Sequence, residues 1–478
     1  MDVDGLPDDV VAKIFSLLPP LMLVDSIPLV CKRWQQLARH PDSWRYFNLY
    51  IPLSPTKQQM IDLSRFAKVA PYLNGIDFSD VLELTPAVTS LVKLLLVDQK
   101  TIKTIRTFRT STKRMRAFTE KMLERFSVSL REVHFTLASP NSVTEEFYTS
   151  INCLLTLASE IPQLLTLSFN FIDVEDFQNY SGQLGKGCPS LKKFVLVGAL
   201  FFEGEWDKII FDVLESKKDQ LQDIDIEFLC EPMEKFVEAI RNCHNVETLR
   251  IPMGLLAVAS HMSRLQSLHL CFNEDYDCML TQDILKYVKD SPSIGKIKKL
   301  GVCCLSDELR VMYTKASKCL EAISKRSKDI QVFCVLNVAN LNVLSMFLSK
   351  MNLLHTLIIH NSWASRKPFG TILDVNSKIS NLSYLKYLKL TDLKFRMRSE
   401  KDAFDITVHL LKEMQPRLVV TYNSEVVNVS DSDSGSELSS LSYDYDEQEF
   451  TYFDYLRNRY GEDLSDSELY ALMSSDDD

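Results

Sequence analysis

The sequence predicts an α/β fold in which three short N-terminal helices precede a long array of alternating strands and helices. Two observations support this prediction. Apolar residues keep helical spacing through the first fifty residues, and the pattern L-x-x-L-x-L, with Ile, Val or Phe replacing Leu, then recurs along the middle of the chain. A third observation marks the end of the array, because the chain closes on an acidic stretch rich in Ser and Asp.

The first helix is predicted from the spacing of Val11, Ile14, Phe15 and Leu18, which places these side chains on one helical face. Pro7 and the two aspartates after it suit a helix start, where proline is tolerated and negative charge is favourable. The Pro-Pro pair that follows Leu18 ends the helix, since proline lacks the amide hydrogen that a helix interior needs.

Two further short helices are predicted. One covers about Leu21 to Ile27. Pro28 suits the first turn of the other, in which Val30, Trp34 and Leu37 recur at helical spacing.

This N-terminal unit has more apolar faces than it can bury by itself. Between Leu6 and Phe47, 22 of 42 residues are apolar, and Val10 and Leu17 make the first helix apolar on more than one face. So small a unit is only marginally stable alone, and surplus apolar surface indicates a protein partner. The alternative is a helical cap on a larger core, which gives no reason for Leu-Pro, Ile-Phe, Val-Cys and Trp at these spacings.

The stretch LPDDVVAKIFSLLPPLMLVDSIPLVCKRWQQLARHPDSW resembles the F-box, the adaptor-docking module of SCF-type ubiquitin ligases, over roughly Gly5 to Leu49. The resemblance implies docking on a Skp-type adaptor, and through it on cullin and RING subunits, with Phe15, Leu37 and Trp44 in the module's own core. Pro28 departs from the family pattern, which often has uninterrupted helix there. The residues implied for adaptor binding are Leu6, Pro7, Ile14, Leu18, Val30, Cys31 and Trp34.

The repeat pattern occurs twelve times at spacings of 19 to 38 residues. Alternation within each block predicts a short strand with one buried face. The blocks begin at Leu73, Val92, Leu130, Leu164, Leu191, Leu221, Val246, Leu265, Ile297, Ile330, Leu354 and Leu385.

The blocks resemble a leucine-rich-repeat solenoid, which implies parallel strands on the concave face and helices on the convex face. Apolar residues at helical spacing before a block, such as Met233, Phe236, Val237 and Ile240, agree with this. The Asn or Cys that full repeats place after the last strand leucine is clear only at Asn273, so we expect about twelve irregular repeats. A helical HEAT-type array is the alternative, and it gives no reason for the six-residue strand blocks.

Together with composition, these resemblances imply a three-part organisation: an F-box at residues 1–50, a leucine-rich-repeat solenoid at 51–422, and an acidic, largely disordered tail at 423–478. From Ser424 onward, 16 acidic and two basic residues give a charge of −14, so the −10 of the whole chain leaves a near-neutral body of +4. The eleven cysteines form no C-x-x-C pair and fit free thiols in the cytosol or nucleus. We expect no signal peptide, no membrane association, no metal and no cofactor.

A basic stretch runs from Lys100 to Arg116 with a single aromatic residue, Phe108. Binding to single-stranded nucleic acid favours interleaved aromatic side chains, so we expect no nucleic-acid partner. The stretch is expected to be a solvated loop or helix face, or to meet an acidic partner. No H-E-x-x-H, G-x-S-x-G or P-loop motif is present, and an enzyme is not expected.

The favoured functional hypothesis is a substrate-recognition subunit of an SCF-type E3 ubiquitin ligase. The alternative is an interaction scaffold, bound to the adaptor or independent of it, without a role in degradation. An unidentified protein substrate is expected to contact strand side chains that point away from the core. The candidate substrate-binding residues are Thr248, Arg250, Ser267, His269, Ile358, His360, Tyr387 and Lys389.

Overall fold

The computed structural model divides the chain into two units, Met1–Val427 and Asn428–Asp478. The predicted acidic tail beyond residue 426 and Asn273 lie outside the residues that the structure describes. These are residues 5–426 except for 83, 99–100, 140–143, 173–179, 181, 199–205, 227–233, 273–285, 287, 305–311, 337–347, 349–350, 352, 361–362, 365–383, 396–397 and 415.

The first fifty residues contain short helices, as predicted, but the third of the predicted helices begins later in the chain than expected. Cys31 is extended, with φ of −162°, and its Sγ accepts a hydrogen bond from the backbone N of Trp34, so it caps the helix. Val30 and Pro28 therefore precede this helix. The short elements are α1 (Asp8–Phe15), the π-helix η2 (Met22–Ser26), the 3-10 helix η3 (Ile27–Leu29), α2 (Lys32–Leu37) and the 3-10 helix η4 (Pro41–Trp44).

The described strands form one 15-stranded sheet in which neighbouring strands are parallel and follow the chain order from β1 to β12. At its far end β14 pairs with β12, β13 and β15. The strands are β1 (Asn48–Tyr50), β2 (Leu73–Asp77), β3 (Ile102–Arg109), β4 (Glu132–Ala138), β5 (Thr166–Ile172), β6 (Lys193–Gly198), β7 (Asp223–Ile226), β8 (Thr248–Pro252), β9 (Ser267–Phe272), β10 (Lys299–Cys304), β11 (Val332–Leu336), β12 (Thr356–His360), β13 (Trp363–Ala364), β14 (Tyr387–Phe395) and β15 (Val419–Val426).

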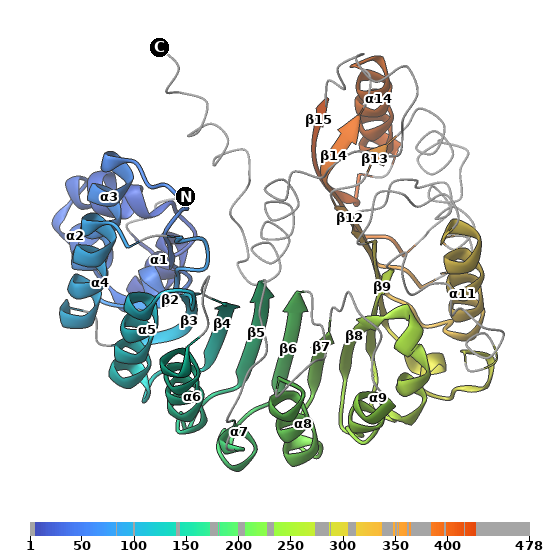
Figure 1. Cartoon of the computed structure of the whole chain (residues 1–478). Helices are drawn as coiled ribbons and strands as arrows, with labels where there is room; N and C mark the ends of the chain where they lie inside the picture. The colour runs from blue at the N-terminus through green and yellow to red at the C-terminus, as the bar shows by residue number, and fades with distance from the viewer. Residues whose placement is uncertain are drawn as a thin grey trace, which may run out of the picture. The chain divides into compact units, whose positions relative to one another are not determined.

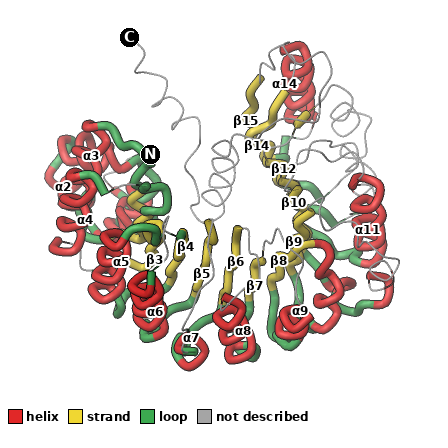
Figure 2. Tube along the Cα trace, in the orientation of Figure 1, coloured by secondary structure: helices red, strands yellow, loops and turns green. Residues whose placement is uncertain are grey.

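Within Met1–Val427 the strands line the inner side of a curved array and the helices cover its outer side (Figures 1 and 2). This confirms the predicted α/β fold with strands on one face and helices on the other. The helices are α3 (Lys57–Val69), α4 (Pro86–Asp98), α5 (Lys113–Phe126), α6 (Glu145–Ser159), α7 (Gln183–Lys186), α8 (Trp206–Lys217), α9 (Glu234–Arg241), α11 (Met312–Arg326), α14 (Arg398–Met414), and the 3-10 segments η5 (Met253–His261) and η7 (Ile294–Lys296).

Eleven of the twelve predicted strand blocks begin at an observed strand or two residues before it. The block at Val92 is wrong, because it lies inside α4. Val88, Leu91, Val92 and Leu95 are buried at the i, i+3, i+4, i+7 spacing of a helix. The strand of this repeat is β3, which carries much of the basic stretch.

The core lies between the sheet and the helices and is continuous along the array. Leu167, Phe194, Ile224, Leu249 and Leu268 stand side by side on successive strands, and each is fully buried. Residues before and after them on the same strand point to the opposite face of the sheet. That opposite face, which lines the inner side of the array, is called the inner face below.

Candidate functional site

The first candidate surface lies in the first fifty residues, where apolar side chains remain exposed between the end of α1 and the start of α2. Leu29 is 84% exposed and Leu17 is 75% exposed. Large apolar side chains at such exposure, gathered in one short segment, indicate a surface that a partner covers. The other exposed members are Ile14, Leu21, Met22 and Val30.

Polar contacts hold the short helices in place beneath this surface. Arg33 on α2 donates from Nε to Asp8 Oδ1 at 2.8 Å and also donates to the carbonyl of Leu6, which ties α2 to the start of α1. The indole nitrogen of Trp44 donates to the carbonyl of Ala38 at 2.7 Å inside the core. The exposed segment is therefore displayed on a fixed framework.

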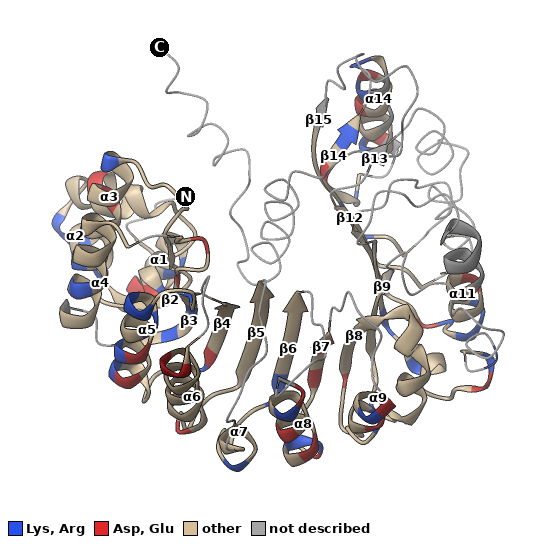
Figure 3. Cartoon of the chain, viewed as in Figure 1, with Lys and Arg blue, Asp and Glu red and all other residues tan. Residues whose placement is uncertain are grey.

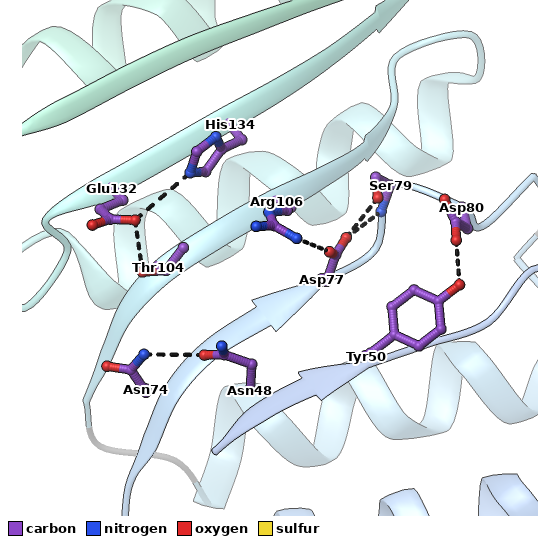
Figure 4. Close-up of polar contacts among 10 residues, drawn as sticks. All are labelled: Asn48, Tyr50, Asn74, Asp77, Ser79, Asp80, Thr104, Arg106, Glu132 and His134. Carbon is purple, nitrogen blue, oxygen red and sulfur yellow. Dashed lines mark hydrogen bonds and ion pairs between the residues drawn. The ribbon is translucent and has the colours of Figure 1, made fainter. Parts of the chain in front are cut away.

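The second candidate surface is the inner face, and its first part, from β1 to β8, is polar. Asp77 Oδ2 lies 2.7 Å from Arg106 Nη1, and Ser79 donates to Asp77 Oδ1 from its hydroxyl at 2.6 Å and its backbone N at 3.0 Å (Figure 4). Burial raises the pKa of the Asp77 carboxyl, but the Arg106 charge and the Ser79 hydrogen bonds outweigh burial and leave that pKa below its usual value.

The same pairing continues on the next strands. Glu132 accepts a hydrogen bond from Thr104 Oγ1 at 3.3 Å and lies 3.7 Å from His134 Nε2 (Figure 4). Burial lowers the pKa of His134 below its usual value, the bond to Glu132 offsets part of this, and the Arg106 charge adds to it. Lys193 then pairs with Asp223 at 2.9 Å. The charges on this part of the inner face are therefore largely neutralised by one another.

The second part of the inner face, from β10 to β14, is mostly apolar. Val332 and Cys334 on β11 and Ile358 on β12 are partly exposed, and Tyr387 on β14 is 53% exposed. These four residues are called the apolar strip below. Burial raises the pKa of the Cys334 thiol to about 12, so this side chain is uncharged at neutral pH.

A polar cluster borders the apolar strip at the far end of β12 and β14. His360 Nδ1 lies 2.9 Å from both Asp392 Oδ2 and Thr391 Oγ1. Asp392 sits at an irregularity in the β14–β15 pairing with φ of 54°, and Asn423 Nδ2 donates to its carboxylate at 3.1 Å. Burial raises the pKa of Asp392, but the His360 contact outweighs it and leaves the pKa below its usual value.

All eight predicted substrate-binding residues lie on strands of the sheet, but two of them are not accessible. Arg250 is 2% exposed and Ser267 is 6% exposed. Arg250 packs against Asp225 on β7 and donates from Nε to Cys271 Sγ at 3.2 Å, which encloses the side chain. Their prediction as surface residues was wrong, because exposure on this face depends on the neighbouring strands. The six that keep partial or full exposure are Thr248, His269, Ile358, His360, Tyr387 and Lys389.

Residues 3–50 match the family model described as F-box-like. These residues form an F-box-like domain. No curated protein matches the chain. An F-box-like domain implies binding to a Skp-type adaptor, and proteins with this domain are generally adaptors rather than enzymes. The repetitive parallel sheet behind the F-box-like domain fits a leucine-rich-repeat solenoid.

The seven predicted adaptor-binding residues fall into two groups that differ in how much of each side chain is buried. Leu6, Leu18 and Trp34 are partly buried and pack on the core, and the Trp34 ring meets the buried Phe15 ring edge-on at 5.2 Å. Phe15, Leu37 and Trp44 are buried, as predicted for the core of the domain. The remaining four, Pro7, Ile14, Val30 and Cys31, are exposed.

The predicted adaptor-binding residues did not include four exposed members of this surface, and two of these are its most exposed, Leu29 and Leu17. The other two are Leu21 and Met22. The exposure of Leu17 could have been predicted from its position outside the apolar face of the first helix. For Leu29, the signal would have been Pro28, which confines its neighbours to a short 3-10 helix with too few residues to bury them.

The basic stretch is not a loop, because it forms strand β3 and the start of helix α5. Ile102–Arg109 is strand β3, Arg106 pairs with Asp77, and Arg116 is buried, donating to the carbonyl of Thr110 at 2.7 Å. Lys113 pairs with Glu146. The charges of Arg106 and Arg116 are therefore used inside the fold, whereas Lys113 and Arg114 are exposed at the start of α5. In Figure 3 the charged residues of the described chain lie mainly along the outer helices.

Two further observations concern the described residues only. No group of three His, Cys, Asp or Glu side chains among them is arranged to hold a metal ion. None of the helices they form is long and apolar enough to cross a membrane.

Proposed function

We propose that the chain is a substrate-recognition subunit of an SCF-type E3 ubiquitin ligase. The F-box-like domain would bind a Skp-type adaptor, and through it cullin and RING subunits, while the inner face of the solenoid would hold a protein substrate. We further propose the division into residues 1–50, 51–422 and 423–478, and a location in the cytoplasm, the nucleus or both.

The observation that carries this proposal is the exposed apolar segment of the F-box-like domain. Leu17 and Leu29 contribute almost nothing to the core of the free protein, yet burying a leucine stabilises a complex by about 2 kcal/mol. An adaptor surface that covers them accounts for their exposure. Of the four exposed residues that the family resemblance implies for docking, Ile14 and Val30 belong to this exposed segment, Cys31 follows it directly, and Pro7 lies just before α1.

The role of the solenoid in this proposal is to hold the substrate, not to react with it. Ubiquitin transfer would take place on other subunits, and the chain would act by raising the effective concentration of a substrate lysine near the conjugating enzyme. The length of the inner face supports this role, since strands from β1 to β15 offer side chains along one continuous sheet.

Adaptor binding is tested on the full chain with a substitution that leaves the core intact. Leu29→Asp combined with Val30→Asp places charge on the exposed segment and should abolish co-purification with a recombinant Skp-type adaptor. Leu18 and Trp34 suit this test less well, because they also pack on the core. The matched control is Val128→Asp, since Val128 is 77% exposed after α5 and lies outside the F-box-like domain.

Undiminished adaptor binding by the Leu29/Val30 variant would refute this docking surface. If docking is confirmed, the scaffold alternative is tested by the half-lives of bound proteins after depletion of the chain. Unchanged half-lives of every bound protein would favour the scaffold.

A further inference from the structure

The inner face changes character along the array, and the change can be followed in the strand register. On β2 to β7 the inward positions carry ion pairs that neutralise one another, such as Asp77 with Arg106 and Lys193 with Asp223. From β10 to β14 the corresponding positions carry the apolar strip. Tyr387 is exposed and Val332 and Ile358 remain partly exposed beside it, and neighbouring apolar side chains left accessible to solvent indicate contact with another molecule.

The apolar strip lies between two lysines. In register order, Lys299 on β10 stands beside Val332, then Thr356 and then Tyr387. The next inward row reads Gly301, Cys334, Ile358 and Lys389. Val332 and Ile358 therefore lie on the diagonal that runs from Lys299 to Lys389.

Both lysines are exposed, and neither forms an ion pair with another described residue. The positive charge of Lys389 acts on Asp392, which is already paired with His360 and accepts a hydrogen bond from Asn423. The strip and its borders therefore present a net positive charge. An occupant with carboxylates at its ends would complement them.

The strip has a defined boundary toward the middle of the array. A Cβ on Gly301 would lie 2.0 Å from Nδ1 of His269, so the imidazole on β9 covers the position that a side chain at 301 would take. Beyond it, Arg250 is buried against Asp225. An occupant of the strip is thus confined to β10 and the strands after it.

We propose that the apolar strip binds an extended, acidic and hydrophobic segment of the protein substrate. This inference rests on the proposed function and names its substrate class. Two carboxylates of the segment would meet Lys299 and Lys389, and one or two apolar side chains between them would pack on Val332, Ile358 and Tyr387.

The strand spacing sets the length of that segment. Lys299 and Tyr387 are three strands apart, roughly 14 Å at about 4.8 Å per strand, and Lys389 lies two residues further along β14. The diagonal is therefore on the order of 16 Å. An extended chain advances about 3.4 Å per residue, so the two acidic residues should be four or five positions apart.

The test uses the full chain and a displayed library of random 12-residue peptides. The library should yield peptides with two Asp or Glu residues four or five positions apart and Leu, Ile, Phe or Tyr between them. One enriched peptide, labelled with fluorescein, is then titrated against the wild type and four variants by anisotropy. Lys389→Glu, Lys299→Glu and Tyr387→Ala should each weaken binding about tenfold or more. Each charge reversal places a repulsive charge beside a carboxylate of the peptide, and Tyr387→Ala removes an apolar contact of the strip.

The matched control is Lys192→Glu, which reverses the charge of an exposed lysine just before β6. It should leave the dissociation constant within about twofold of the wild type, since it lies outside the strip. Replacing one acidic residue of the peptide by lysine should restore binding to Lys389→Glu and weaken binding to the wild type. Circular dichroism of each variant checks that the fold is kept.

Enrichment of basic peptides, or equal binding to the wild type and Lys389→Glu, would overturn the proposal. The Leu29/Val30 variant separates this outcome from a failure of the proposed function. That variant should lose the adaptor and keep the peptide, whereas Lys389→Glu should lose the peptide and keep the adaptor. If the Leu29/Val30 variant kept the adaptor while Lys389→Glu lost the peptide, only the ligase proposal would fail.

Discussion

Asp225 and Arg250 face each other on β7 and β8, with their side chains 0% and 2% exposed and 3.9 Å between Arg250 Nε and Asp225 Oδ1. Cys271 on β9 accepts a hydrogen bond from the same Arg250 nitrogen at 3.2 Å. A buried charge is costly unless it is paired, so each of these two residues depends on the other. The pair stands where the polar part of the inner face ends.

Removing one partner of this pair should be much more harmful than removing both. Arg250→Met leaves the Asp225 carboxylate buried without its counter-charge, and we expect a loss of about 3–5 kcal/mol in the free energy of unfolding. Asp225→Leu combined with Arg250→Met removes both charges and should restore most of the lost free energy of unfolding. Urea denaturation followed by circular dichroism measures the difference. Equal midpoints for the single variant and the wild type would show that the pair does not support the fold.

Stability should also depend on pH through His134. Because burial holds the folded pKa of His134 below its usual 6.5, the unfolded chain takes up this proton at a higher pH than the folded chain does. The contribution of His134 is complete above about pH 6.5 and is lost as pH falls toward the folded pKa. In urea midpoints measured from pH 8 to pH 5, His134→Gln should flatten the acid side of the profile.

Glu132 provides the internal control for this prediction. Burial lowers the pKa of His134, and the hydrogen bond to the Glu132 carboxylate raises it. Glu132→Gln should therefore lower the folded pKa of His134 further. The loss of stability attributed to His134 should then continue to a lower pH, at no more than about 1.4 kcal/mol per pH unit. An unchanged profile in both variants would contradict the assignment of this proton to His134.

Much of the fold could be predicted from the sequence because each strand must bury one row of side chains. Leu249 and Leu268 are examples, since their alternation with polar residues is visible without any structure. The exception is instructive. Val92 belongs to a run of apolar residues that satisfies both the strand pattern and the helical spacing, and β3, with its Lys, Arg and Thr, gives a weaker strand signal than the run before it.

The candidate surfaces were less predictable, because exposure is a property of neighbours in space. Arg250 alternates along its strand with buried apolar residues, which predicts an exposed side chain. Asp225 and Cys271 on the adjacent strands nevertheless enclose it. Leu29 looks like a core residue, yet it is exposed because the short helices around Pro28 end before they can cover it. Neither outcome follows from spacing along the chain.

Two glycines allow a matched test of the backbone. Gly198 ends β6 with φ of 97°, and a Cβ there would lie 2.1 Å from the carbonyl oxygen of Phe171. Gly198→Ala should destabilise the fold by about 1–3 kcal/mol, because the conformation is strained for alanine and a strand carbonyl cannot move away. In Gly254→Ala the new Cβ meets nothing within 4 Å, and the 3-10 segment η5 tolerates alanine. That control should be neutral or slightly stabilising in thermal unfolding.

The F-box-like domain should depend on the solenoid for its fold. Its Trp44 ring contacts Phe47 at a centroid distance of 5.4 Å, and Phe47 contacts Phe66 of α3 at 5.6 Å, so the aromatic core crosses the boundary of the domain. Strand β1 also pairs with β2, whose residues lie beyond position 50. A fragment of residues 1–50 would lack both partners and expose the underside of its own core.

We therefore expect the 1–50 fragment to show little helical circular dichroism and no cooperative thermal transition. A longer fragment ending after β3, at residue 110, retains α3 and the pairing of β1 with β2, and should recover helical signal. In the full chain, Phe47→Ala should destabilise the F-box-like domain by about 3–5 kcal/mol if the aromatic contacts hold it to the solenoid. A 1–50 fragment that folds cooperatively as a monomer would show instead that the domain is autonomous and that the Phe47–Phe66 contact only orients it.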